Sequence, residues 1–241
     1  MSVTSTHVRQ HDSVLAGIEK RALIAIAKKL PRWINSDHLS ALGLAAMAGA
    51  GASFVVAGTD PVAGASLVVL CLFLNWFGDS LDGTVARVRD QQRPRYGYYV
   101  DHVIDLAGTA LLFAGLAASG YMSPMIATLV VAAFFLVSAE TYLATHSRGI
   151  FKMAFLGVGP TELRILLAAG AVALVNTPTV DPFGSGPMRL WDLGGVIGAI
   201  GMVFTFIVAS CRNTRALYLE ETRPGAAPAA RLIPANEGGK A

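Results

Sequence analysis

Long stretches without charged residues alternate along the chain with short charged segments. Five stretches of 16 to 34 residues contain no Asp, Glu, Lys or Arg: 39–59, 61–78, 106–139, 165–180 and 193–211. A helix that crosses a bilayer needs about 20 mostly apolar residues. The longest stretch could hold most of two helices, and 120–124 (GYMSP) is the natural break between them. The pattern predicts six membrane-spanning helices, at 39–58, 61–80, 99–119, 124–145, 161–177 and 191–211.

The composition supports this interpretation. Hydrophobic residues make up 54% of the 241 residues, charged residues make up 15%, and the mean hydropathy is +0.53. An ordinary soluble domain has about 25% charged residues. These values argue against a soluble globular protein and against a disordered chain. We therefore expect an all-α integral membrane protein, with one six-span domain at residues 33–215.

The flanking segments have a different character. Residues 1–12 are expected to be disordered, and residues 216–241, rich in Ala, Pro and Gly, to form a flexible tail. Residues 13–32 place apolar residues at helical spacing among lysines and arginines. This suits an amphipathic juxtamembrane helix on the inner leaflet, or equally a helix packed on the domain's own cytoplasmic face. We expect no signal peptide, and the two cysteines offer no disulfide framework.

The distribution of basic residues predicts the orientation. If the N-terminus lies in the cytoplasm, 18 of the 19 Lys and Arg residues lie on the inside, and Arg189 is the one outside. Cytoplasmic loops of membrane proteins carry such an excess. Six spans would then place both termini on the cytoplasmic side.

Four aspartates lie at the predicted inner ends of the second and third spans. Asp79 and Asp82 are three residues apart, and Asp101 and Asp105 are four apart, so each pair shares a helix face. The loop between the spans returns the chain to the same membrane boundary. The four carboxylates are therefore expected to converge at the cytoplasmic edge of the membrane.

Four clustered carboxylates repel one another unless a cation lies between them. Carboxylate oxygens suit Mg²⁺, Mn²⁺ or Ca²⁺. Two cations about 3.5–4 Å apart could hold a diphosphate and stabilise its leaving group. Gly83 and Ala86 have little side-chain bulk where a ligand would approach, and Arg87 offers a forked donor for phosphate.

The aspartates allow two other interpretations, as interfacial residues or as part of a transport pathway. A single Asp or Arg at the end of a span is usually just an interfacial residue, but four at these spacings make that explanation improbable. The second alternative interpretation is a cation-coupled transporter with an acidic pathway. A transport pathway is expected to place its carboxylates nearer the middle of the bilayer, whereas all four lie at one edge.

These residues resemble the signature of the CDP-alcohol phosphotransferase family, D-x2-D-G-x2-A-R followed by G-x3-D-x3-D. The matching positions are Asp79, Asp82, Gly83, Ala86, Arg87, Gly97, Asp101 and Asp105. The spacer between the two halves is nine residues, one more than is usual in the family, which leaves the path of the loop open. The six spans and the juxtamembrane helix also look like the family, so the resemblance covers about residues 14–215.

The resemblance implies a reaction and its site. An acceptor hydroxyl would attack the phosphate next to the alcohol of a CDP-alcohol, and CMP would leave. Asp79, Asp82, Asp101 and Asp105 would bind two divalent cations, Mg²⁺ or Mn²⁺, and Asp105 would also be the general base. The CDP site would be shaped by Gly83, Ala86, Arg87 and Gly97, with Asn35 near the cytidine. Membrane lipids are expected partners, nucleic acid is not, and the family implies a homodimer.

The donor remains open between two branches of the family. Asp101-His102-x-x-Asp105 looks like the choline/ethanolamine branch, which transfers from CDP-choline or CDP-ethanolamine to diacylglycerol; His102 would then be either catalytic or a supporting residue. Arg148, Lys152 and Arg164 could instead bind an acceptor phosphate. That arrangement belongs to enzymes that use CDP-diacylglycerol with inositol phosphate, glycerol phosphate, inositol or serine. The residues favour the first branch, and positive-inside topology alone can explain the three basic residues.

Overall fold

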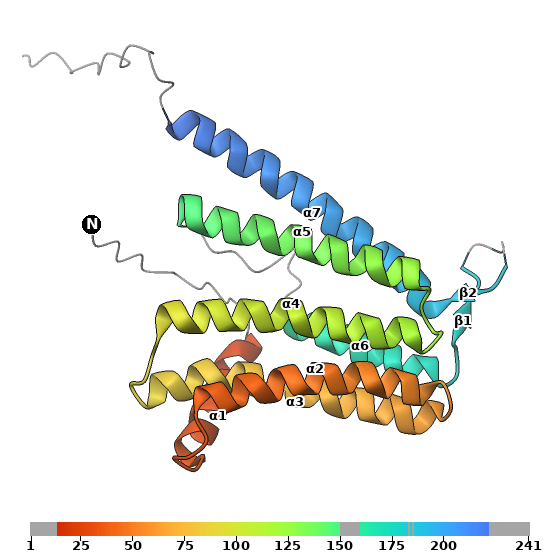
Figure 1. Cartoon of the computed structure of the whole chain (residues 1–241), viewed down its shortest axis with the longest axis horizontal. Coiled ribbons are helices and arrows are strands. Elements are labelled where there is room, and N and C mark those ends of the chain that lie inside the picture. The colour runs from red at the N-terminus through yellow and green to blue at the C-terminus, as the bar shows by residue number, and fades with distance from the viewer. Residues whose placement is uncertain (1–13, 150–159, 183, 185, 222–241) are drawn as a thin grey trace, which may run out of the picture.

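The computed structural model describes residues 14–149, 160–182, 184 and 186–221, which form seven helices and one short hairpin (Figure 1). The helices are α1 Val14–Lys29, α2 Ser36–Ala57, α3 Pro61–Val88, α4 Pro94–Ala118, α5 Pro124–Arg148, α6 Pro160–Leu174 and α7 Leu190–Glu220. Strands β1 Thr179–Val180 and β2 Met188–Arg189 pair antiparallel.

The helix starts follow local sequence signals. A proline stands in the first turn of α3, α4 and α5, where its missing N–H costs no hydrogen bond. Asp60 and Ser123 cap α3 and α5 through their side chains. Asn35 caps α2 by accepting from the His38 N–H at 3.0 Å, and His38 Nδ1 accepts from the Asn35 N–H in return.

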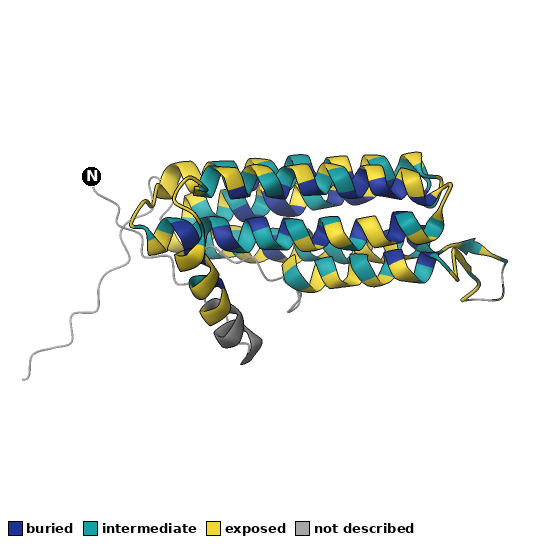
Figure 2. Ribbon diagram, turned by 90° about the horizontal axis from the view of Figure 1, so that it is seen from below, coloured by how far each residue is buried: buried dark blue, intermediate teal, exposed yellow. Residues whose placement is uncertain are grey.

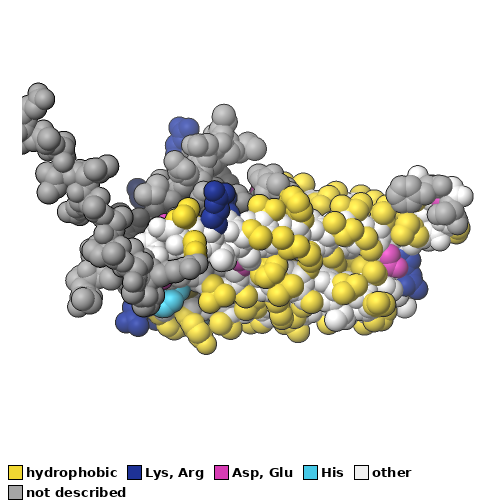
Figure 3. All heavy atoms as spheres, turned by 90° about the horizontal axis from the view of Figure 1, so that it is seen from above, with side chains coloured by type: hydrophobic (Ala, Val, Ile, Leu, Met, Phe, Trp, Pro, Cys, Tyr) yellow, Lys and Arg dark blue, Asp and Glu magenta, His cyan; other side chains and the backbone are white. Residues whose placement is uncertain are grey.

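Five of the described helices are long and apolar enough to cross a membrane: α2, α3, α4, α5 and α7. Apolar side chains cover the flank of these helices, and charged side chains gather near their ends (Figure 3). The protein is therefore an integral membrane protein. α6 has 15 residues and is not among the five, so the structure shows five of the six predicted spans by this measure.

The helices extend beyond several of the predicted boundaries. α3 continues to Val88, past the predicted end at 80, and α4 begins at Pro94 rather than 99. The charged residues at the edge of the membrane thus remain helical, and all four aspartates lie within helices. α7 continues to Glu220, so residues 216–220 are helical rather than part of the expected tail. Residues 1–12 and 222–241 lie outside the described residues.

The juxtamembrane helix α1 packs on the end of α3. Leu23 and Ala27 are buried in one cluster with Leu81 and Val85. The guanidinium of Arg89 fixes the turn that follows α1, because its Nη2 donates to the carbonyl oxygens of Leu30 and Pro31 at 2.9 and 3.1 Å. Of the two interpretations of residues 13–32, packing on the domain's own surface is the one that these contacts support.

The main core lies between α2, α3, α4, α6 and the starts of α5 and α7 (Figure 2). Within it, the rings of Phe54 and Trp191 meet edge-to-face with centroids 5.1 Å apart. α2 and α3 approach closely at the other end. A Cβ at Gly78 would stand 2.6 Å from the Leu39 carbonyl oxygen, which real structures do not tolerate. This close crossing brings polar side chains of α2 within reach of the aspartates on α3.

α5 and α7 run side by side in the same direction (Figure 1). At their starts, the Ser123 N–H donates to Asp192 Oδ1 at 2.6 Å. At their ends, Arg148 Nη1 donates to Asn213 Oδ1 at 2.7 Å. Two parallel helices require the chain to return across the bundle between them, and α6 is the described helix in that interval.

Candidate functional site

The four predicted aspartates line one small cavity between α2, α3 and α4. Its volume is about 10 Å³, room for about one water molecule. The residues around it are Ser40, Gly43, Asn75, Asp79, Asp82, Asp101, Ile104 and Asp105. The convergence predicted from the helical spacing is thus present.

Asp82 is held by two hydrogen bonds. Its Oδ2 accepts from the Ser40 hydroxyl at 2.7 Å, across from α2, and its Oδ1 accepts from the Gly83 N–H. Both bonds favour the ionised carboxylate and fix its orientation. The sequence interpretation missed Ser40 because its role depends on the close crossing of α2 and α3.

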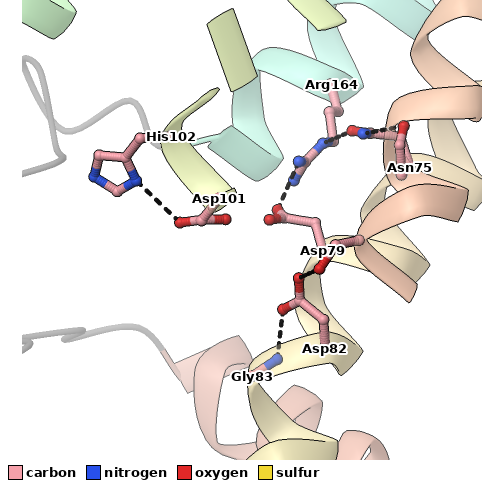
Figure 4. A network of polar contacts seen from close by, with 9 residues as sticks. Asn75, Asp79, Asp82, Gly83, Asp101, His102 and Arg164 are labelled. Atoms are coloured by element: carbon pink, nitrogen blue, oxygen red, sulfur yellow. Dashed lines mark hydrogen bonds and ion pairs between the residues drawn. The ribbon is translucent and has the colours of Figure 1, made fainter. Parts of the chain in front are cut away.

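Arg164, on α6, reaches into the same site (Figure 4). Its Nη2 lies 2.7 Å from Asp79 Oδ2, and its Nε donates to Asn75 Oδ1 at 2.7 Å. Asn75 in turn donates from Nδ2 to the Gly43 carbonyl oxygen at 3.0 Å. Asn75 was also missed, although a buried amide within an apolar span was a readable signal.

His102 is buried beside Asp101, with Nδ1 3.3 Å from Asp101 Oδ2. Its ring contacts two tyrosines, with its centroid 4.1 Å from that of Tyr98 and 4.7 Å from that of Tyr142. The three rings join α4 to α5 next to the carboxylates. His102 therefore contacts the site through Asp101, as a supporting residue would.

The side chains around the cavity suit a hard divalent cation, since four of them are carboxylates, whose oxygens such cations prefer. Among the described residues, no three His, Cys, Asp or Glu side chains are grouped closely enough to hold a metal ion. Arg164 supplies positive charge at Asp79 instead. The residue types fit the predicted metals, while ligation requires the carboxylates to approach one another more closely.

A second, larger cavity of about 420 Å³ lies toward the loop end of the same helices. It is lined by Asn35, Ser36, Asp37, Val85, Ala86, Gln91, Gln92 and Arg93. Ser36 of the larger cavity lies four residues before Ser40 of the small one, and Ala86 lies four residues after Asp82. The two cavities are therefore about one helical turn apart. Small-molecule sites typically have about 300–1,000 Å³.

An ion pair lies at this larger cavity. Arg93 Nη2 is 2.5 Å from Asp37 Oδ1, which joins the start of α4 to the start of α2. The hydrogen bond to Asp37 raises the pKa of the Arg93 guanidinium above its usual value, so the arginine stays charged. A carboxylate and a guanidinium are thus both presented at the cavity.

The remaining predicted residues are placed as follows. The Arg87 guanidinium lies 3.3 Å from where a Gly83 Cβ would be, and its Nη2 donates to Thr84 Oγ1 at 3.0 Å. A Cβ at Gly97 would meet no described atom within 4 Å. The first turn of α4 therefore has room beside Gly97, while the space at Gly83 is taken by Arg87.

The predicted basic cluster is not assembled in the described residues. Arg148 bonds to Asn213 and to Glu220, whereas Arg164 bonds to Asn75 and Asp79. Each arginine therefore pairs with a carboxylate on a different helix, Glu220 on α7 and Asp79 on α3. Lys152 lies outside the described residues.

Sequence comparison decides the family. The profile described as CDP-alcohol phosphatidyltransferase matches residues 37–207, which include the small cavity and all four aspartates. The chain belongs to the CDP-alcohol phosphatidyltransferase family. It is an enzyme of class EC 2.7.8 that makes phospholipids, and the family uses divalent metals. The transporter interpretation is thereby set aside.

The fold is similar to that of a phosphatidylinositol phosphate synthase of known structure. The crystal structure of Mycobacterium tuberculosis phosphatidylinositol phosphate synthase with CDP-DAG bound superposes with a TM-score of 0.53 and 20% identity. The match covers 85% of this chain and 96% of that one. No curated protein sequence matches the chain. The family match does not separate the two donor branches.

Proposed function

We propose that this phosphatidyltransferase binds two divalent cations, Mg²⁺ or Mn²⁺, through Asp79, Asp82, Asp101 and Asp105. The observation that carries the proposal is that these four carboxylates, from two helices, line a single cavity. When bound, such cations neutralise charge on a diphosphate and stabilise its leaving oxygen. The Ser40 and Gly83 bonds to Asp82 hold one ligand in place.

Asp105 is the proposed general base. It would accept the proton of the acceptor hydroxyl as the hydroxyl oxygen forms its bond to the phosphorus next to the alcohol. The bond between that phosphorus and the bridging oxygen of CMP breaks, and CMP leaves with the bonding electrons. A positioned base of this kind contributes about 10²–10⁴ in rate. His102 would support Asp101 rather than take the proton itself.

The larger cavity is the proposed site for the nucleoside. It lies about one helical turn from the carboxylates, a separation that suits a cytidine joined to a diphosphate held at the carboxylates. Ala86 and Asn35 line it, and we assign Gly83, Arg87 and Gly97 to the path between nucleoside and phosphates. Cytosine carries an amino donor, which a carboxylate accepts. Asp37 is therefore the residue that we expect to distinguish cytosine from uracil.

For the donor, we favour a CDP-choline or CDP-ethanolamine type with diacylglycerol as acceptor. The supporting observation is that three aromatic side chains, Tyr98, His102 and Tyr142, contact one another directly beside Asp101. Aromatic faces attract ammonium groups, and a neighbouring carboxylate strengthens that attraction. The D-H-x-x-D pattern that first favoured this branch contributes one of these rings.

The alternative is CDP-diacylglycerol as donor with a polar acceptor. It is favoured by the likeness to the Mycobacterium tuberculosis enzyme, whose crystal structure contains CDP-DAG. It is also favoured by the position of Arg164. The guanidinium of this residue lies beside the carboxylates, where it could bind the phosphate of a polar acceptor. In this alternative Arg148 and Lys152 retain their proposed role toward that phosphate.

We also infer a sixth crossing, formed by α6, and a cytoplasmic active site. Because α5 and α7 are parallel, the chain must return between them. Fifteen helical residues span about 22 Å, less than the roughly 30 Å of hydrocarbon, so a full crossing needs more residues than α6 itself supplies. The excess of basic residues at the aspartate end supports a cytoplasmic site.

A panel of donors and acceptors tests the proposal. Protein purified in detergent with Mn²⁺ would be given CDP-choline or CDP-ethanolamine with diacylglycerol, and separately CDP-diacylglycerol with inositol phosphate, glycerol phosphate, inositol or serine. We expect CMP release with the first pairs. Release only with CDP-diacylglycerol would establish the alternative, and release with none would contradict both.

A further inference from the structure

We propose that Arg164 competes with a divalent cation for Asp79: the guanidinium is held at Asp79 Oδ2 and must leave this oxygen before a cation binds there. This inference rests on the proposed function, which makes Asp79 a metal ligand. It adds an order to the reaction, in which cation loading precedes phosphate binding by Arg164.

The guanidinium is firmly placed at the carboxylate. The side chain of Arg164 is 15% exposed and that of Asp79 is 31% exposed. Nη2 and Nε each make a 2.7 Å contact, one to Asp79 and one to Asn75. Asn75 is itself buried and anchored on the Gly43 carbonyl oxygen, so it fixes the direction of the arginine fork.

The charges explain why the arginine lies there. Four carboxylates around a cavity of about 10 Å³ repel one another, and the guanidinium offsets part of that repulsion. The same guanidinium occupies one of the two Asp79 oxygens and repels a divalent cation that approaches the other. The carboxylate therefore has two competing positive partners.

Displacement of Arg164 has a consequence for the substrate. A guanidinium released beside the cavity presents a planar fork that suits phosphate oxygens. The cation would then hold Asp79 while Arg164 meets a phosphate of the substrate. Arg164 would act as an exchangeable counter-charge, and α6 would move relative to α3 or the side chain would rotate when the metal loads.

Mn²⁺ affinity separates this role from a merely structural one. The free Mn²⁺ signal in electron paramagnetic resonance would be followed during titration of the detergent-purified full chain, without nucleotide. Arg164→Gln removes the competing charge, and we expect Mn²⁺ to bind about tenfold more tightly, within the usual range of coupling between sites. Turnover of the same variant should fall, because the phosphate contact is lost.

Arg148→Gln is the matched control. Arg148 is 16% exposed, has an Asn and a carboxylate as partners, and lies at the end of α5 rather than at the four aspartates. Its Mn²⁺ affinity should equal that of the wild type. Asn75→Ala, which removes the anchor of the fork and keeps the arginine, gives a second test and should tighten Mn²⁺ binding about threefold.

Unchanged or weaker Mn²⁺ binding in folded Arg164→Gln and Asn75→Ala would overturn the proposal. Asp79→Asn distinguishes that result from failure of the proposed metal site. If Asp79→Asn weakens Mn²⁺ binding while the arginine variant does not tighten it, the metal site stands and the competition does not. If Asp79→Asn leaves the affinity unchanged, Asp79 is not a ligand, and the proposal falls together with that assignment.

Discussion

The Ser40 hydroxyl donates to Asp82 Oδ2 at 2.7 Å and thereby joins α2 to the carboxylates on α3. Ser40→Ala removes that bond, and we expect Mn²⁺ affinity to fall about tenfold, the lower end of the effect of losing a partner of a metal ligand. Isothermal titration calorimetry with Mn²⁺ measures this affinity. Ser66→Ala, a serine that bonds only to its own helix on α3, is the control and should bind Mn²⁺ normally.

Asp105→Asn should reduce the turnover number at least 100-fold while CMP still binds. The amide keeps the shape of the side chain but cannot accept the proton of the acceptor hydroxyl. Turnover is measured as CMP release at saturating donor, and binding as protection against thermal unfolding by CMP. Turnover within a few-fold of the wild type would show that Asp105 is not the base.

Asp37→Asn should weaken the preference for cytosine. A carboxylate accepts from the amino group of cytosine and repels the O4 oxygen of uracil, whereas an amide can donate to that oxygen. We expect the ratio of kcat/KM for the CDP-alcohol over the UDP-alcohol to fall about tenfold. Asp90→Asn, an exposed residue that does not line the larger cavity, should leave this ratio unchanged.

Tyr142→Leu tests the aromatic group beside Asp101. Loss of one ring should raise KM for CDP-choline about fivefold, within the range for a partly desolvated ammonium over an aromatic face. The inhibition constant of CMP, which has no ammonium group, should not change. Tyr218→Leu, an exposed tyrosine on α7, is the control. An equal loss for CDP-choline and CMP would argue against recognition of the headgroup.

The six crossings can be tested by accessibility. A tag after residue 241 should be cleaved by protease only from the cytoplasmic side, and Thr177→Cys should react with an impermeant thiol reagent only from the outside. Cys211 is exposed in the structure and would be replaced by Ser first. Labelling of Thr177→Cys from the cytoplasmic side, together with cleavage of the tag from the outside, would mean that α6 does not cross.

The sequence could predict what depends on local pattern. Uncharged runs located the helices, and spacings of three and four placed the aspartates on shared faces. It could not predict Arg164 at Asp79, because those residues are 85 positions apart and meet only through the packing of α6 on α3. The basic cluster was predicted from charge alone, and the fold instead pairs Arg148 with Glu220 and Arg164 with Asp79.

The dependence of CMP release on a divalent cation tests the central claim most directly. Release from the preferred donor would be followed in the wild type with Mn²⁺, with EDTA, and in an Asp79→Asn, Asp101→Asn double variant, together with the number of Mn²⁺ ions bound per chain. We expect two ions per chain and release that stops with EDTA and in the double variant. Release that persists in EDTA, or undiminished release from the double variant, would contradict the account.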